Sequence, residues 1–259
     1  VQACGLMPLL KRESAIIRAR TGTGKTALFG LPLLQAVQRG EIRRALVLAP
    51  TRELVMQIGE DARELGKFTG LSTVTLIGGA DYAKQLQKVN QRVTDIVVAT
   101  PGRLIDFLQR RDMFLDRVES LVLDEADRML DVGFRQQIQR IARACGTKRQ
   151  TGLYTATLTK GVRELAASIT KDASHIGLAE PDTIPETIMH NLVFCDSHEH
   201  KLEVLDLMLS KGNVRQALVF VTTQKAVEEL IEHVSVQGHT AAPAHGGMTT
   251  SERSASDRK

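Results

Sequence analysis

Short apolar runs alternate with longer segments of helical periodicity along the first two thirds of the chain. Buried strands are predicted at residues 15–17, 44–49, 72–77, 95–99, 120–124 and 150–154. Amphipathic helices are predicted between them, at residues 25–37, 53–65, 82–90, 104–109, 134–144 and 162–169. This alternation is typical of an α/β fold, in which helices cover both faces of a parallel sheet.

The pattern changes near residue 180. Residues 181–186 contain two prolines and few apolar groups, which predicts a linker between a first domain, residues 1–180, and a second, residues 187–259. In the second domain, strands are expected at 187–194, 216–221 and 239–244, and helices at 199–209 and 225–236. Three strands make an incomplete sheet, so we expect a truncated domain with exposed apolar surface.

The composition is that of an ordinary globular protein, with 42% hydrophobic and 25% charged residues among 259. The net charge of +4 favours a polyanionic partner without requiring one. No apolar stretch is long enough to span a bilayer and no signal peptide is evident, so we expect a cytoplasmic protein without a membrane partner. The three cysteines are widely spaced, which predicts buried thiols and supports neither a disulfide framework nor a zinc site. Because the chain opens without Met and stops within a charged stretch, we expect a fragment.

A glycine-rich segment follows the first strand and precedes a helix, which predicts a phosphate site at a helix N-terminus. Gly22 and Gly24 allow a tight turn with inward N–H groups, Lys25 can reach the β and γ phosphates, and the hydroxyl of Thr26 can bind Mg²⁺. Ala19 stands where the general pattern has glycine, but it is still small. The candidate phosphate-binding residues are Ala19, Arg20, Thr21, Gly22, Thr23, Gly24, Lys25 and Thr26.

Two carboxylates follow the buried run Leu121–Leu123. Ligands bind at the carboxyl ends of strands in open α/β sheets. Asp124 is therefore predicted to hold Mg²⁺ together with Thr26, and Glu125 to orient or deprotonate an attacking water. With Lys25, these two carboxylates are the candidate catalytic residues.

Three further segments at strand ends supply donors for a row of phosphates. Alone, each is more typical of a capped strand-to-helix turn, but three on one sheet edge indicate a nucleic-acid track. Aromatic residues make up only 3% of the chain, so recognition through the phosphate backbone is expected rather than base stacking. The candidate residues are Pro50, Thr51, Arg52, Gly79, Thr100, Gly102 and Arg103.

Taken in order, Gln2, ARTGTGKT, APTREL, IGG, ATPGR, LDEAD and TAT resemble the DEAD-box family of ATP-dependent RNA helicases, and DEADRMLDVGF is most similar to bacterial members. The resemblance implies two RecA-like domains, the second truncated, with ATP, Mg²⁺ and RNA as ligands. It also implies that Gln2 reads adenine. TAT replaces the family's SAT, whose hydroxyls bond the last Asp of the DEAD string, so Asp127, Thr155 and Thr157 are implied coupling residues.

The expected function is ATP-dependent unwinding of short RNA duplexes through domain closure. The sequence stops before the family's last two motifs, which carry the arginine fingers, so the resemblance implies ATP binding with poor hydrolysis. Two alternatives stay open. One is a truncated ATP-gated RNA-binding module with negligible turnover. The other is a DNA helicase or translocase, which Gln2 and the DEAD string disfavour.

Overall fold

The computed structural model describes residues 2–19, 22–91, 94–177, 189–212 and 214–248. The chain divides into two compact units, Val1–Thr183 and Ile184–Lys259. The expected linker, residues 181–186, lies outside the described residues.

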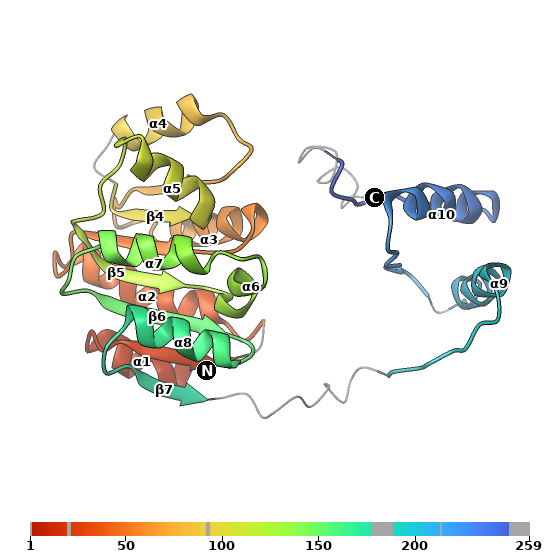
Figure 1. Cartoon of the computed structure of the whole chain (residues 1–259), viewed down its shortest axis with the longest axis horizontal. Coiled ribbons are helices and arrows are strands. Elements are labelled where there is room, and N and C mark those ends of the chain that lie inside the picture. The colour runs from red at the N-terminus through yellow and green to blue at the C-terminus, as the bar shows by residue number, and fades with distance from the viewer. Residues whose placement is uncertain (1, 20–21, 92–93, 178–188, 213, 249–259) are drawn as a thin grey trace. The chain divides into compact units, whose positions relative to one another are not determined.

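The first unit is built on one seven-stranded sheet in the order β3-β4-β2-β5-β6-β1-β7 (Figure 1). The strands are β1 (Ala15–Arg18), β2 (Arg44–Leu48), β3 (Thr73–Leu76), β4 (Ile96–Ala99), β5 (Val118–Leu123), β6 (Gln150–Thr155) and β7 (Ser174–Gly177). Every neighbouring pair is parallel, which confirms the predicted fold class. All carboxyl ends therefore meet at one edge of the sheet.

Helices cover both faces of this sheet (Figure 1). One face carries α1 (Gln2–Leu10), α2 (Lys25–Gln38) and α3 (Arg52–Leu65). The other carries α4 (Tyr82–Gln91), α5 (Pro101–Gln109), α6 (Ala126–Asp131), α7 (Arg135–Ala144) and α8 (Lys160–Ile169). Successive residues of β2 enter opposite cores, Leu46 and Leu48 on the α5 side, Ala45 and Val47 on the α2 side. None of the described helices is both long and apolar enough to cross a membrane.

The predicted strands of the first unit are present, with ends that shift by up to two residues. The elements that were not predicted are α1, α6 and the edge strand β7. Strand β7 contains Ser174 and His175 and is only partly buried, so it lacks the apolar run that marks the central strands. Gly133, with φ of 87°, lies between α6 and α7.

The second unit contains α9 (His198–Leu209) and α10 (Gln224–Val236), joined by a 3.0 Å contact between His233 Nε2 and Asp206 Oδ1. In its described residues no strand forms, so the strands predicted at 187–194, 216–221 and 239–244 are wrong as far as these segments are described. A strand needs a hydrogen-bonded partner and a face to bury. Phe194 and Phe220 are instead 83% and 87% exposed, and no apolar face is covered there.

Candidate nucleotide and nucleic-acid site

The phosphate loop joins β1 to α2. Gly22 and Gly24 have φ values of 77° and 82°, in the left-handed region that glycine adopts without strain. Gly24 is the N-cap of α2, so the loop brings the N–H groups at the start of that helix to the carboxyl edge of the sheet. Arg20 and Thr21 lie outside the described residues, as does the side chain of Gln2, the first residue of α1.

Lys25, the first residue of α2, is buried beneath the loop. Its Nζ donates a 3.2 Å hydrogen bond to the carbonyl of Ala19, at the start of the loop. The ammonium also acts electrostatically on Asp124 and lowers the pKa of that carboxyl, although this effect is smaller than that of burial. The structure therefore brings together Ala19, Lys25 and Asp124, which the sequence placed in two separate strings.

Asp124 is only 3% exposed and follows β5. Its N–H donates to the carbonyl of Leu48 (2.9 Å) and extends the ladder between β5 and β2. Burial raises the pKa of Asp124 to about 6, because a carboxylate loses hydration there, while the charge of Lys25 acts in the opposite direction. The site thus holds a poorly solvated carboxylate, which gains from a cation placed beside it.

Glu125 leaves the line of the strand through an unusual backbone conformation. Its φ of 51° is left-handed, which costs a non-glycine residue on the order of 1 kcal/mol. Its N–H donates to Asp124 Oδ1 (3.0 Å), and its carboxylate lies 3.3 Å from Arg128 Nη1. The strained turn therefore directs the two adjacent carboxylates to different neighbours.

Asp127 connects α6 to the segment after β6. The N–H and hydroxyl of Thr157 donate to Asp127 Oδ2 at 2.8 and 2.7 Å, and the hydroxyl of Thr155 donates to the carbonyl of Thr157 (2.8 Å). Burial raises the pKa of Asp127, but the hydrogen bonds, led by those from Thr157, outweigh it and hold the pKa below its usual value. Thr157 is the main partner of Asp127, and Thr155 supports it.

The candidate nucleic-acid residues follow β2, β3 and β4, which are neighbours in the sheet. Thr51 caps α3 by accepting a hydrogen bond from the N–H of Leu54 (3.2 Å). The guanidinium of Arg52 occupies the space beside Gly79 where a Cβ would stand, so the segments after β2 and β3 are in contact. Thr100 is buried and its N–H donates to the carbonyl of Leu76 (3.0 Å). Pro50 is buried and Gly102 half-buried at the same edge.

Arg103 differs from the other candidates because its side chain is turned inward. It is 9% exposed, and its Nη2 donates to the carbonyl of Ala80 (3.0 Å). A guanidinium in this position faces the back of the turn that contains Gly79 rather than solvent.

Two side chains near the site, those of Gln85 and Tyr154, were not predicted from the sequence. Gln85 is 7% exposed and hydrogen-bonded to Ile77; its signal is a polar residue on the apolar stripe of α4, beside Tyr82, Leu86 and Val89. Tyr154 is fully buried, and its hydroxyl has no hydrogen-bond partner among the described residues. Burial, reinforced by the charge of Asp124, raises the pKa of Tyr154. No sequence pattern marks that hydroxyl.

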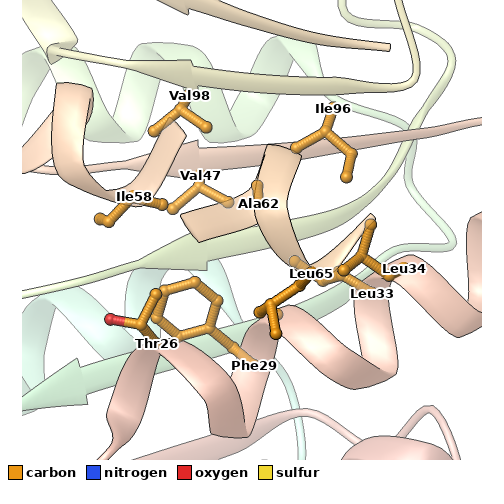
Figure 2. A pocket seen from close by; sticks show the side chains of 11 residues that line it. Thr26, Phe29, Leu33, Leu34, Val47, Ile58, Ala62, Leu65, Ile96 and Val98 are labelled. Carbon is orange, nitrogen blue, oxygen red and sulfur yellow. The ribbon is translucent and has the colours of Figure 1, made fainter. Parts of the chain in front are cut away.

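An apolar crevice lies between α2 and α3, over β2 and β4 (Figure 2). Phe29, Leu33, Ile58 and Leu65 are among its lining residues, and Thr26 is the single described residue of the phosphate segment that reaches it. The crevice offers few polar groups to orient a charged ligand. The candidate chemistry therefore lies at the sheet edge and not in this crevice.

Comparison with known proteins gives the site a family context. A sequence model described as "DEAD/DEAH box helicase" matches residues 1–165. The chain is 40% identical to the ATP-dependent RNA helicase RhlB of Pseudomonas aeruginosa over 98% of its own length and 66% of that protein. It is 35% identical to the DEAD-box ATP-dependent RNA helicase CshA of Bacillus cereus, over 100% and 49% of the two chains. The chain thus spans about half to two thirds of these relatives.

Solved structures of RNA helicases share the fold of this chain. A Saccharomyces cerevisiae Dbp5 variant bound to RNA and ADP BeF3 superposes with a TM-score of 0.83 at 30% identity, over 98% of this chain and 65% of that one. A hypothetical ATP-dependent RNA helicase from Sulfolobus tokodaii gives a TM-score of 0.63 at 28% identity, over 96% and 70%.

Proposed function

Since the chain belongs to the DEAD/DEAH box helicase family, we propose that it is part of an RNA helicase that couples ATP binding and hydrolysis to local duplex unwinding. One observation carries the proposal. The ends of β1, β6 and β5, which are neighbours in the sheet, bear the phosphate loop, the Thr155–Thr157 segment and Asp124. The ends of β2, β4 and β3, the adjoining neighbours, bear the candidate RNA residues.

Nucleotide binding follows from the first half of this edge. Lys25 exchanges its bond to Ala19 for the β and γ phosphates of ATP, and the N–H groups at the start of α2 receive the remaining oxygens. Gln2 reads the adenine base, as the family resemblance implies. ATP is supported by the names of the relatives.

A magnesium ion fits the residues that are present. Asp124 is a poorly solvated carboxylate and Thr26 offers a hydroxyl, and oxygen donors of this kind suit Mg²⁺. When bound, the ion neutralises charge on the phosphates. Glu125 orients and deprotonates the attacking water, after its contact with Arg128 opens.

RNA binding follows from the second half. Arg52 supplies a charge, and Thr51, Thr100 and the backbone N–H groups at Gly79 and Gly102 supply neutral donors to the phosphate backbone, which implies little sequence preference. The Dbp5 structure, described as bound to RNA, supports this assignment. The bond between Asp127 and Thr157 joins the helix that follows Asp124 and Glu125 to the segment after β6. We expect this bond to couple ATP binding to RNA binding.

The test uses the full-length parent protein and measures ATP turnover with and without RNA. RNA is expected to raise turnover, and Glu125→Gln to lower it at least 100-fold, on the order found for the loss of a positioned general base. Glu60→Gln, an exposed carboxylate on α3, is the matched control and should leave turnover unchanged. If RNA does not stimulate turnover, or if both variants behave alike, the helicase assignment is wrong.

A further inference from the structure

The turn after β3, residues 77–81, carries the glycine pair of the candidate RNA surface. Gly79 is exposed, has a φ of 72° and lies against the guanidinium of Arg52. Adjacent glycines have wide conformational freedom, so such a turn has little stiffness of its own. If its N–H groups are to meet phosphates at fixed positions, the turn must be held by other residues.

Gln85 holds the turn from α4. Its Oε1 accepts a hydrogen bond from the N–H of Ile77 (2.9 Å), and its Nε2 donates to the carbonyl of the same residue (3.1 Å) and to that of Asp81 (3.3 Å). One buried amide therefore pairs with backbone groups at both ends of the turn. Replacing it with an apolar side chain would remove the bonds to the N–H and carbonyl of Ile77, whereas the carbonyl of Asp81 would keep its 3.3 Å bond from the backbone N–H of Gln85.

Arg103 holds the middle of the turn from α5. Beyond its 3.0 Å bond to the carbonyl of Ala80, its guanidinium carbon lies 5.5 Å from the ring of Tyr82 and its Nε 3.8 Å from Asp106. With a side chain 9% exposed, the guanidinium lies behind the turn, where Nη2 is hydrogen-bonded and Nε and Nη1 have no hydrogen-bond partner among the described residues.

Tyr82 anchors the helix that carries Gln85. Its hydroxyl donates to Asp112 Oδ2 (2.5 Å), its ring centroid lies 4.5 Å from that of Phe107, and the guanidinium of Arg110 lies 4.6 Å from the ring centre. These contacts fix the start of α4 against α5 and the residues after it. Both holding side chains therefore extend from elements that are themselves fixed.

We propose that Gln85 and Arg103 are positioning residues for RNA binding: they clamp the turn 77–81 so that its backbone N–H groups face the phosphates. In this arrangement Arg103 acts through the carbonyl of Ala80 and does not itself contact RNA. The inference rests on the proposed RNA binding, and it replaces the direct contact that the sequence predicts for Arg103.

The experiment measures the affinity of the full-length parent protein for a fluorescent single-stranded RNA over a range of salt concentrations. Loss of one direct phosphate contact reduces the slope of log K against log salt by about 0.7 for single strands, whereas loss of a positioning residue weakens binding without changing the slope. Arg52→Met, which removes an expected direct contact, should reduce the slope. Gln85→Met and Arg103→Met should each weaken binding about tenfold at an unchanged slope, because buried hydrogen bonds to the turn are lost.

Gln87→Met on the exposed side of α4 is the matched control and should bind RNA as the wild type does. In all variants the KM for ATP should stay unchanged. Hydrogen exchange of the amides at residues 78–80 should be faster in Gln85→Met than in the wild type, and unchanged in Gln87→Met. The positioning role is wrong if Arg103→Met reduces the slope of log K against log salt, or if Gln85→Met binds RNA with wild-type affinity. If Arg103→Met does not fold, the result for Gln85→Met alone tests the proposal. Absence of RNA binding by the wild type instead overturns the proposed function.

Discussion

At Asp124, folding and the proposed metal binding make opposite demands on one carboxyl group. Burial raises its pKa to about 6, so above that pH the folded protein retains a charge that water would solvate better. Keeping this charge poorly solvated costs free energy in the folded protein. Unfolding removes the cost, because the carboxyl is then solvated and ionises near its ordinary pKa. The cost is present in full above about pH 6 and disappears as the pH falls toward 4. A bound cation would remove it.

Replacing Asp124 with Asn is therefore expected to stabilise the nucleotide-free protein. A pKa raised from 3.8 to about 6 corresponds to at most about 3 kcal/mol in the free energy of unfolding at pH 8. Denaturant unfolding at pH 8 and pH 4.5 measures the difference between variant and wild type, which should be large at pH 8 and small at pH 4.5. A difference independent of pH would show that ionisation of Asp124 is not its cause. Binding of Mg²⁺ with ATP should be lost in the variant.

Tyr154 carries a buried polar group that is uncharged, in contrast to the carboxylate of Asp124. Its hydroxyl is buried without a partner among the described residues, while its ring packs edge-on at 5.1 Å from Phe29. Tyr154→Phe removes only the unpaired oxygen and keeps the packing. The free energy of unfolding, measured with denaturant, should stay the same or rise by up to about 1 kcal/mol. A fall of more than 1 kcal/mol would mean that the hydroxyl has a stabilising partner.

Among the elements, those with a strong local signal could be predicted from the sequence. Interior strands such as β2 and β4 are buried on both faces, so nearly every residue is apolar and the run is continuous. Strand β7 is a half-exposed edge strand, and α1 has weak amphipathicity, so neither leaves such a pattern. The three strands expected in the second unit show the converse error, since apolar runs predict a strand only where another strand pairs with them.

The site divides in the same way. Glycines, Lys25 and Asp124 were predictable because the chemistry of a phosphate loop prescribes residue types at fixed spacing. The inward orientation of Arg103 and the role of Gln85 depend on how α4 and α5 pack on the turn. Packing of this kind brings Arg103 to the carbonyl of Ala80 and Gln85 to Ile77 without any local pattern.

The hydrogen bond between Asp127 of α6 and Thr157, which follows β6, leads to a further prediction about how these elements act together. Thr157→Val removes the hydroxyl that donates to Asp127 but keeps the N–H bond to the same oxygen. Affinities for ATP and for RNA, each measured alone, should stay within about twofold, whereas RNA-stimulated turnover should fall about tenfold, the equivalent of one hydrogen bond of about 1.4 kcal/mol to a charged group. Thr73→Val, on the edge strand β3, is the control. Unchanged stimulation would mean that this bond is only structural.

At the scale of the whole molecule, the two units differ in how much apolar surface they bury. The first has a core on each face of its sheet, whereas Val234 is the single buried hydrophobic residue in the described part of the second. Helices α9 and α10 have 12 and 13 residues. Isolated helices shorter than about 12 to 15 residues are marginal in water, because most helix stability in proteins comes from packing.

Hydrogen exchange of the 259-residue chain should therefore separate the two units. Amides of β2 and β5 lie in the centre of the sheet and should exchange only through global unfolding, while those of α9 and α10 should exchange through local opening, orders of magnitude faster. A truncated chain of residues 1–177 should accordingly keep the thermal unfolding midpoint of the sheet unit and its affinity for ATP. Slow exchange in α10, or a lower midpoint on truncation, would mean that the second unit contributes a core to this chain. The contact between Asp206 and His233 cannot supply one, because it is partly exposed and both elements that it joins lack a buried face.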